Sequence, residues 1–242
     1  MLLLQFSTSH YCRKARLALG YKQISFQVEN LTPGLHILKL KPLTGLTTMP
    51  VLLPQIKGQP QAIPRSRFST RRYANAIADS TQIIKFLESY QPEPALFLTN
   101  HEQQTEALML EDWLDESIGT ATRFVYYHFR AGEGKQIDPS LFSQMVISVV
   151  RKQYGINDAT VELATNRLAT ALAELSIRWQ KSEYLVGGSL SVADITAAAL
   201  LSPLALIPQY RQGYPWLFER IVQIHQLCGE QLPPGLVPQG ES

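Results

Sequence analysis

The residues best suited to chemistry, Ser9 and Cys12, lie where a short apolar segment gives way to a helical pattern. Backbone N–H groups at a helix start have no partner within the helix, and the helix dipole adds about half a positive charge there. A thiolate at such a position is stabilised, so its pKa falls from about 8.5 toward neutrality. The spacing indicates thiol chemistry, although an ordinary helix cap at Ser9 and an inert buried Cys12 explain it too.

Two further segments carry groups that could hold a ligand. Asp79 and Ser80 precede a second helical pattern, and a serine hydroxyl beside backbone N–H groups suits a carboxylate. A neighbouring acid can orient an ammonium group, but plain helix capping explains the same pair. Met49 and Pro50 stand just before the apolar residues Val51, Leu52 and Leu53, and an X–Pro bond is cis in only about 5–6% of cases by default.

A strand–helix–strand unit is expected to position the first of these segments. Residues 2–6 have the pattern of a short buried strand, and residues 24–28 alternate as in a half-buried strand. Between them, Cys12 falls on the apolar face of a helix that Gly20 ends. The basic residues of this helix are predicted on its other side: Arg13, Lys14 and Arg16.

The next elements are also short. A helix is predicted over residues 35–40, stopping before Pro42, and a third strand over residues 49–53. Asp79 and Ser80 then begin a helix whose apolar positions follow a helical spacing.

Residues 91–100 form the best candidate linker, because long helical patterns replace the strand patterns after them. Residues 161–179 repeat apolar positions every three or four residues, which predicts a helix with one buried stripe. Residues 195–201 are apolar nearly all round and belong at the centre of a helical bundle. The chain from residue 229 is rich in Pro and Gly and is predicted to be a loose tail.

Charge and cysteine content narrow the function classes. The first 90 residues carry a net charge of +9 and the rest −7, so the front half would attract small anions, although a solvated basic face explains the charge equally well. The 242 residues hold two cysteines and no apolar run of about 20 residues, so no disulfide framework, zinc site or membrane span is predicted. A cytoplasmic protein is the default expectation.

The segment Ser9-His10-Tyr11-Cys12 carries a family resemblance. It looks like the Cys-Pro-Tyr-Cys of glutaredoxins with serine in place of the first cysteine, and it resembles the Ser-Pro-Phe start of serine-type glutathione transferases. The resemblance implies that the Ser9 hydroxyl donates a hydrogen bond to the thiolate of bound glutathione, with Cys12 as the rival catalytic residue. His10 departs from the usual proline.

The other segments extend the resemblance. Met49-Pro50 resembles the cis-proline loop that contacts the cysteinyl part of glutathione, and Asp79-Ser80 resembles the family's Glu-Ser pair, which implies binding of the γ-glutamyl group. Thr48 stands where the family commonly has Gln or Lys for the glycine end. One hypothesis gives that anion contact to a basic residue of the long 54–75 segment, which holds Lys57, Arg65, Arg67, Arg71 and Arg72.

The helical part has its own marker. Residues 190–195 resemble the N-capping box of the transferase helical domain, with Ser191 and Asp194 satisfying each other's backbone N–H groups. This role is structural. The markers appear in the family's order, so the resemblance spans roughly residues 1–225.

The resemblance implies an α+β/α two-domain fold. A thioredoxin-like βαβ-α-ββα domain that binds glutathione is expected over residues 1–90, a linker over 91–100, an all-helical bundle over 101–228 and a tail over 229–242.

The implied activity is conjugation of glutathione, as co-substrate, to a small electrophile, in the manner of detoxifying enzymes. A homodimer is implied by the resemblance alone, and no metal, nucleic acid or membrane partner is predicted. Trp113, Phe124 or Tyr127 could line the electrophile side, although core packing explains them equally well. The alternatives are a glutathione-dependent thiol-disulfide oxidoreductase using Cys12 and a non-catalytic module that binds a ligand or protein.

Overall fold

A computed structural model describes residues 1–54 and 76–237 of the chain. The chain folds into two compact units, Met1–Ala95 and Leu96–Ser242, and the division falls inside the segment predicted as a linker. Among the described residues, no helix combines the length and apolar character needed to cross a bilayer.

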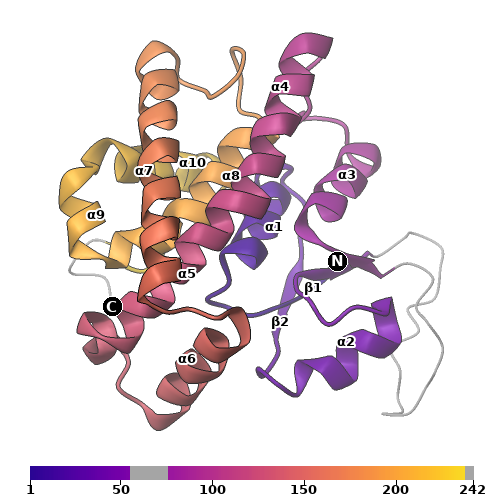
Figure 1. The fold of residues 1–242 in the computed structure, drawn as a ribbon. Coiled ribbons are helices and arrows are strands. Elements are labelled where there is room, and N and C mark those ends of the chain that lie inside the picture. Colours follow the sequence, from indigo (N-terminus) through magenta and orange to yellow (C-terminus); the bar gives the residue numbers. More distant parts are fainter. Residues whose placement is uncertain (55–75, 238–242) are drawn as a thin grey trace. The chain divides into compact units, whose positions relative to one another are not determined.

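The first unit is built on a four-stranded sheet of order β2-β1-β3-β4 (Figure 1). β1 pairs with β2 in parallel, whereas β3 runs antiparallel to both β1 and β4. The strands are β1 (Leu2–Gln5), β2 (Gln27–Asn30), β3 (Val51–Leu53) and β4 (Ile77–Ala78). The helices are α1 (His10–Tyr21), α2 (His36–Thr44) and α3 (Ser80–Tyr90). This order is the predicted thioredoxin-like fold, which is confirmed.

The sheet is covered on both faces, as the continuous apolar run of β1 requires. Leu4 packs with Val51 and with Leu40 and Leu43 of α2. Leu3, the neighbour of Leu4, points to the opposite face and is fully buried, and α1 and α3 pack against each other.

Two predicted elements have bounds that differ from those observed. The strand predicted over residues 24–28 is wrong in position: β2 begins at Gln27 and is largely exposed, and it lies at the edge of the described sheet, beside β1. The helix predicted to stop before Pro42 continues through it and ends at Gly45, whose φ of 80° provides the left-handed helix end. Proline lacks the N–H that a helix interior uses, but a short exposed last turn tolerates that loss.

The basic side predicted for α1 is buried, so these three residues do not belong to a solvated basic face. Arg13, Lys14 and Arg16 are at most 9% exposed. Lys14 Nζ donates to Thr81 Oγ1 at 3.0 Å, and an Arg16 guanidinium N–H donates to Gln5 Oε1 at 2.5 Å. Buried cations require such polar partners, because desolvation of an unpaired charge costs several kcal/mol.

Lys22 links the end of α1 to the end of α3 through a salt bridge and hydrogen bonds. It is fully buried, and its Nζ lies 2.5 Å from a carboxylate oxygen of Glu88. The same ammonium donates to the backbone carbonyls of Gln91 and Pro92, each at 2.9 Å. Lys22 thus satisfies the last turn of α3 and the chain that leaves it.

The second unit is helical. Its α-helices are α4 (His101–Asp112), α5 (Gly119–Ala131), α6 (Leu141–Tyr154), α7 (Asp158–Lys181), α8 (Val192–Leu201), α9 (Pro208–Gly213) and α10 (Pro215–Leu227). A π-helical stretch, Trp113–Ile118, joins α4 to α5, and two 3₁₀ segments, Glu133–Ile137 and Ser202–Leu206, follow α5 and α8.

The apolar patterns of this unit form its core. Every residue of α8 is buried, and α7 buries the predicted stripe from Ala164 to Trp179. The Asp194 carboxylate accepts hydrogen bonds from the backbone N–H and hydroxyl of Ser191 at 3.0 and 2.8 Å and from the Leu185 N–H at 2.8 Å. Burial raises the pKa of Asp194, against the lowering effect of these hydrogen bonds. The pairing of Ser191 with Asp194 confirms the structural capping box.

The prediction of a loose tail is wrong as far as Val237. Pro233 and Leu236 are buried, and the guanidinium of Arg211 donates to the Gly235 carbonyl. Gly235 has a φ of 87°, and a Cβ there would lie 2.9 Å from the Ala205 carbonyl oxygen, so only glycine fits.

Replacing Lys22 with Met should destabilise the first unit by about 3 kcal/mol, because the Glu88 carboxylate would stay largely buried without its cation. Hydrogen-exchange mass spectrometry on peptides from α1 and α3 measures this change. The fluorescence of the three tryptophans, which all lie in the helical unit, reports the other unit separately. Lys85→Met, an exposed change on α3, is the control. Equal exchange in both variants would show that Lys22 contributes nothing to the stability of the first unit.

Candidate functional site

The strand register brings the three predicted segments to one edge of the sheet. Leu4 lies opposite Val51, and Val51 lies opposite Ala78. Because β1 and β3 are antiparallel, the chain leaving β1 and the chain entering β3 meet at the same edge, and so does the chain leaving β4. Ser9, Met49-Pro50 and Asp79-Ser80 occupy these three positions, and the sheet accordingly places them at one edge.

Ser9 is the N-cap of α1. Its backbone is extended, with φ −73° and ψ 124°, and its Oγ accepts the Cys12 N–H at 3.3 Å. The Ser9 carbonyl accepts the Arg13 N–H at 3.0 Å, so the helix begins immediately after this residue. His10 fills the first helical position, where a proline would also be tolerated. The structure therefore places a partly exposed hydroxyl at the positive end of the α1 dipole.

Cys12 points into the core and is fully buried. Burial raises the pKa of its thiol, and the smaller effects of the Ser9 hydroxyl and of the Arg16 charge only partly oppose this. A reactive cysteine needs the opposite environment, with exposure and a lowered thiol pKa.

The cis-proline loop and the start of α3 are joined directly. The Met49–Pro50 peptide bond is cis, and the Pro50 carbonyl accepts the Asp79 N–H at 3.2 Å. Met49 packs at the margin of the Leu4 and Val51 cluster, whereas Thr48 is exposed in the loop before it.

Asp79 caps α3. Its Oδ1 accepts the N–H groups of Thr81 and Gln82, each at 3.0 Å. The φ of Asp79 is 78°, a conformation that strains a non-glycine residue by about 1–3 kcal/mol, and the two capping hydrogen bonds offset that strain. Both hydrogen bonds end on one oxygen, so among the described residues Oδ2 takes no part in the cap. Ser80, the next residue, is 1% exposed.

Sequence reasoning missed the contribution of Lys14. Its hydrogen bond to Thr81 ties α1 to the first turn of α3 and brings a buried cation to that helix start. The two residues are 67 positions apart, so no local pattern could reveal the contact. The basic side chains proposed for the glycine end, Lys57, Arg65, Arg67, Arg71 and Arg72, lie outside the described residues.

Known proteins share this fold. Residues 3–95 match the family described as "Glutathione S-transferase, N-terminal domain". The first unit therefore carries a glutathione transferase N-terminal domain. The match covers almost the whole first unit, including all three segments at the sheet edge.

Solved structures similar to the whole chain have the same two-domain transferase fold. A glutathione S-transferase from Rhodospirillum rubrum F11 is 19% identical with a TM-score of 0.67, over 100% of this chain and 92% of that one. A glutathione S-transferase from Methylobacterium radiotolerans, in complex with glutathione sulfonate, is 19% identical with a TM-score of 0.67, over 96% and 94% of the two chains.

A third, from Methylobacillus flagellatus with glutathione bound, is 21% identical with a TM-score of 0.65, over 93% and 94%. These identities establish the fold alone. A search of curated protein sequences returns no match.

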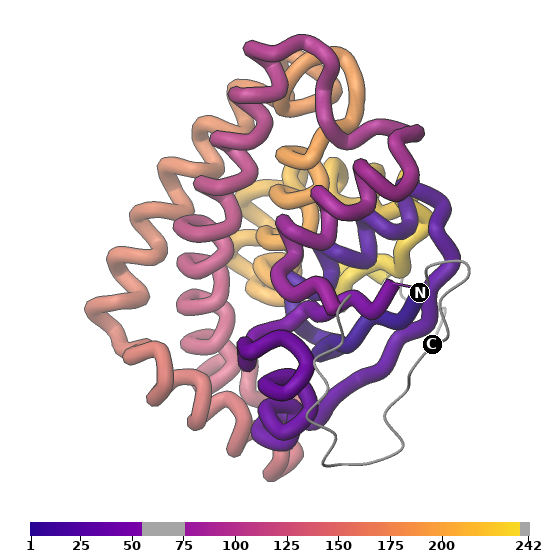
Figure 2. Tube along the Cα trace, turned by 90° about the vertical axis from the view of Figure 1, so that its right-hand side faces the viewer, coloured from indigo at the N-terminus to yellow at the C-terminus, as the bar shows by residue number. Residues whose placement is uncertain are grey.

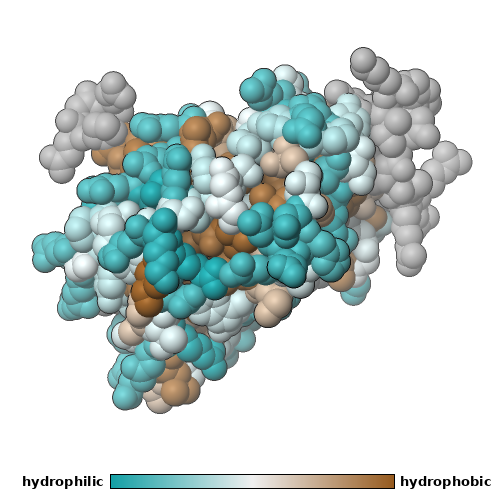
Figure 3. Space-filling view, turned by 90° about the horizontal axis from the view of Figure 1, so that it is seen from above, coloured by the Kyte–Doolittle hydropathy of each residue, from teal (hydrophilic) through white to brown (hydrophobic). Residues whose placement is uncertain are grey.

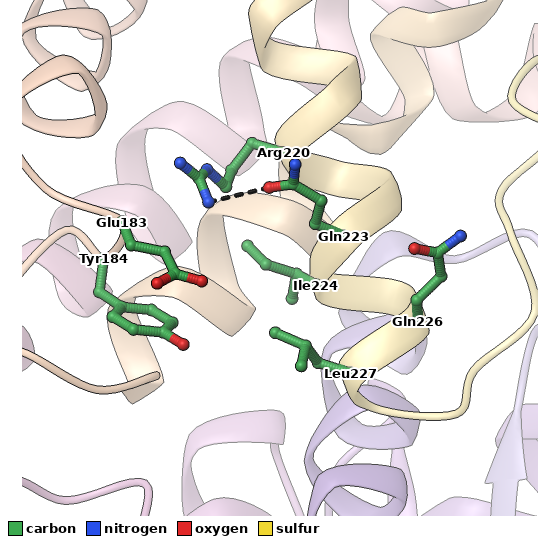
Figure 4. Close-up of a pocket in the computed structure, with 7 residues that line it drawn as sticks. All are labelled: Glu183, Tyr184, Arg220, Gln223, Ile224, Gln226 and Leu227. Carbon is green, nitrogen blue, oxygen red and sulfur yellow. Dashed lines mark hydrogen bonds between the residues drawn. The ribbon is translucent and has the colours of Figure 1, made fainter.

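The helical second unit contains a separate open hollow of about 450 Å³. Figure 4 shows Glu183 and Tyr184 facing α10, where an Arg220 guanidinium N–H donates to Gln223 Oε1 at 2.8 Å. None of the residues predicted for glutathione or for the electrophile lines it. Trp113, Phe124 and Tyr127 lie instead on the π-helical stretch and α5, all partly exposed, and burial raises the pKa of Tyr127.

Both cysteines of the native protein should resist thiol reagents at pH 7 to 8. Cys12 and Cys228 are buried, and burial raises both thiol pKa values, that of Cys228 to about 12. Titration with an aromatic disulfide should release colour only after a denaturant is added. A fast-reacting thiol in the native protein that disappears in Cys12→Ser would contradict this expectation.

Proposed function

We propose that the protein binds glutathione at the edge of its sheet, stabilises the thiolate with the Ser9 hydroxyl and the start of α1, and transfers it to a small electrophile. The observation that carries this proposal is the convergence of Ser9, Met49-Pro50 and Asp79-Ser80, the last two joined by the hydrogen bond from Asp79 N–H to the Pro50 carbonyl. Two structurally similar transferases were solved with glutathione or glutathione sulfonate, which supports the choice of ligand.

Each segment would contact a different part of glutathione. The Ser9 hydroxyl would donate to the thiolate, and the backbone of Met49 would pair with the cysteinyl residue. The start of α3, with Ser80, would receive the γ-glutamyl carboxylate, while Asp79 Oδ2 would accept from its ammonium group. Thr48 would lie near the glycine end.

The reaction requires no covalent bond to the protein. The thiol proton passes to solvent, and the thiolate sulfur attacks the electrophilic carbon. With a chloronitrobenzene, a carbon–sulfur bond forms and the carbon–chlorine bond breaks, so that chloride leaves with the electron pair. Stabilising the thiolate enlarges the reactive fraction of glutathione at neutral pH.

The structure favours Ser9 over Cys12 for this chemistry. A thiol-disulfide oxidoreductase would need the Cys12 sulfur to attack a disulfide, but the side chain is fully buried and its pKa is raised.

Removing the Ser9 hydroxyl should lower kcat/KM for chloronitrobenzene conjugation by about 10- to 100-fold, the effect of losing a hydrogen bond to a charged group. Ser9→Gly is the most informative variant, because glycine removes the hydroxyl but retains most of the N-cap preference. Ser9→Thr keeps the hydroxyl and should retain activity, and Cys12→Ser should conjugate like the wild type. Disulfide reduction, assayed in parallel, should be absent in all of them.

Other results would discriminate between the proposals. Reduction lost only in Cys12→Ser would favour the oxidoreductase. A wild type that is inactive in both assays and is not retained on a glutathione resin would indicate a non-catalytic module.

Asp79→Asn tests the proposed ammonium contact apart from helix capping. Asparagine caps helices as well as aspartate does, so thermal stability should change little. Loss of the carboxylate charge should weaken glutathione binding about tenfold, measured by isothermal titration calorimetry. Asp79→Ala, by comparison, should lower both stability and affinity. Unchanged affinity in Asp79→Asn would confine Asp79 to its structural role.

A further inference from the structure

The hollow of about 450 Å³ in the second unit takes no part in the proposed reaction. It lies between one face of α10 and the segment after α7, which contributes Glu183 and Tyr184. The buried side of α10 packs against α8, and Figures 1 and 2 both show these two helices side by side. Arg220, Gln223 and Leu227 are spaced three and four residues apart, so they share the face of α10 that borders the hollow.

The floor of the hollow is apolar. Ile224 is 2% exposed and Leu227 is 54% exposed, and Figure 4 shows both side chains pointing from α10 toward the Tyr184 ring. A ligand that covers an exposed leucine removes apolar surface from water, which favours binding. Figure 3, which looks onto the end at which α7 finishes, shows small hydrophobic areas among hydrophilic residues. Apolar surface of this extent suits a small ligand.

Two opposite charges border this floor. Burial raises the pKa of Tyr184, Glu183 raises it further and Arg220 opposes the rise, so both charges lie close to the same ring. Among the described residues, no salt bridge joins Glu183 to Arg220. An Arg220 N–H donates to the neutral amide oxygen of Gln223 at 2.8 Å, which orients the guanidinium without neutralising it. The hollow therefore presents one anion and one cation to a ligand.

We propose that this hollow binds a zwitterionic dipeptide with apolar side chains. The Glu183 carboxylate would accept from the ammonium group of the dipeptide, and the Arg220 guanidinium would donate to its carboxylate. Its two side chains would cover Leu227 and the Tyr184 ring, which a single amino acid could not do. The volume of about 450 Å³ falls in the range of small-molecule sites, about 300–1,000 Å³.

This site is independent of the one proposed for glutathione. Its lining residues all lie between Glu183 and Leu227, in the second unit, whereas the glutathione segments lie in the first. A protein that fails to bind glutathione would therefore leave this proposal intact, and the converse also holds.

Leucyl-leucine, titrated into the whole chain, should change the tryptophan fluorescence. Trp179 and Trp216 line a smaller hollow that shares Arg220 with this one, so they report on its occupation. The expected Kd is on the order of 0.2 mM, from the binding energy that ligand atoms typically contribute. Leucyl-leucinamide lacks the carboxylate and N-acetyl-leucyl-leucine lacks the ammonium, so each should bind about tenfold more weakly. Glycyl-glycine lacks the apolar side chains and should not bind.

Two variants assign each charge to its partner. Arg220→Gln should weaken leucyl-leucine about tenfold but leave leucyl-leucinamide unaffected, because the amide already lacks the group that Arg220 contacts. Glu183→Gln should likewise weaken leucyl-leucine and leave N-acetyl-leucyl-leucine unaffected. The matched controls are Arg167→Gln, at an exposed arginine of α7, and Glu219→Gln, at an exposed glutamate of α10 that lines only the smaller hollow. Both should bind like the wild type, and circular dichroism checks that every variant folds.

Three results would overturn the proposal. The first is a wild type that does not respond to leucyl-leucine. The second is equal affinity for leucyl-leucine and either blocked form, which would show that the corresponding charge is not recognised. The third is a loss of affinity in Arg167→Gln or Glu219→Gln as large as that in the two site variants, because the effect would then not be local to the hollow.

Discussion

The antiparallel pairing of β1 with β3 and of β3 with β4 is the constraint on which the candidate site depends. It turns three distant segments of the chain toward the same edge of the sheet. The hydrogen bond from the Asp79 N–H to the Pro50 carbonyl then joins two of them at 3.2 Å. Burial of Leu3 and Leu4 holds β1 at the centre, so the site rests on a rigid core while its groups lie on the loops at the edge.

Buried charges organise this unit around the sheet. Lys14 connects α1 to the first turn of α3, Arg16 reaches Gln5 of β1, and Lys22 connects the last turns of the two helices. Burying each of these cations has a desolvation cost, which only well-placed partners offset. These contacts therefore define how α1 packs against α3 and β1 rather than adding much net stability. The basic charge of the front half is thus partly structural and does not all face an anionic ligand.

The choice between the two thiol mechanisms is a matter of exposure. Ser9 and Cys12 lie one helical turn apart and share a hydrogen bond, yet one is partly exposed and the other is fully buried. The same helix start therefore leaves Ser9 partly exposed and buries the Cys12 sulfur. This arrangement suits stabilisation of a thiolate that arrives with the substrate.

By itself, the sequence determined the elements that depend on local spacing. The apolar run of β1, the Ser9 and Asp79 caps, the buried stripe of α7 and the capping box of Ser191 with Asp194 are all patterns of neighbouring residues. Hydrophobic periodicity and capping act within a few residues, so these elements could be predicted from them, whereas the thioredoxin-like arrangement was implied by the resemblance to glutathione transferases.

Only the tertiary structure decided which residues pair across long separations. The burial of Lys14 and Lys22, the position of β2 at an edge, the passage of α2 through Pro42 and the packing of the chain up to Val237 depend on partners elsewhere in the sequence. Burial is a property of three-dimensional neighbours, and a side chain's type and spacing do not specify it.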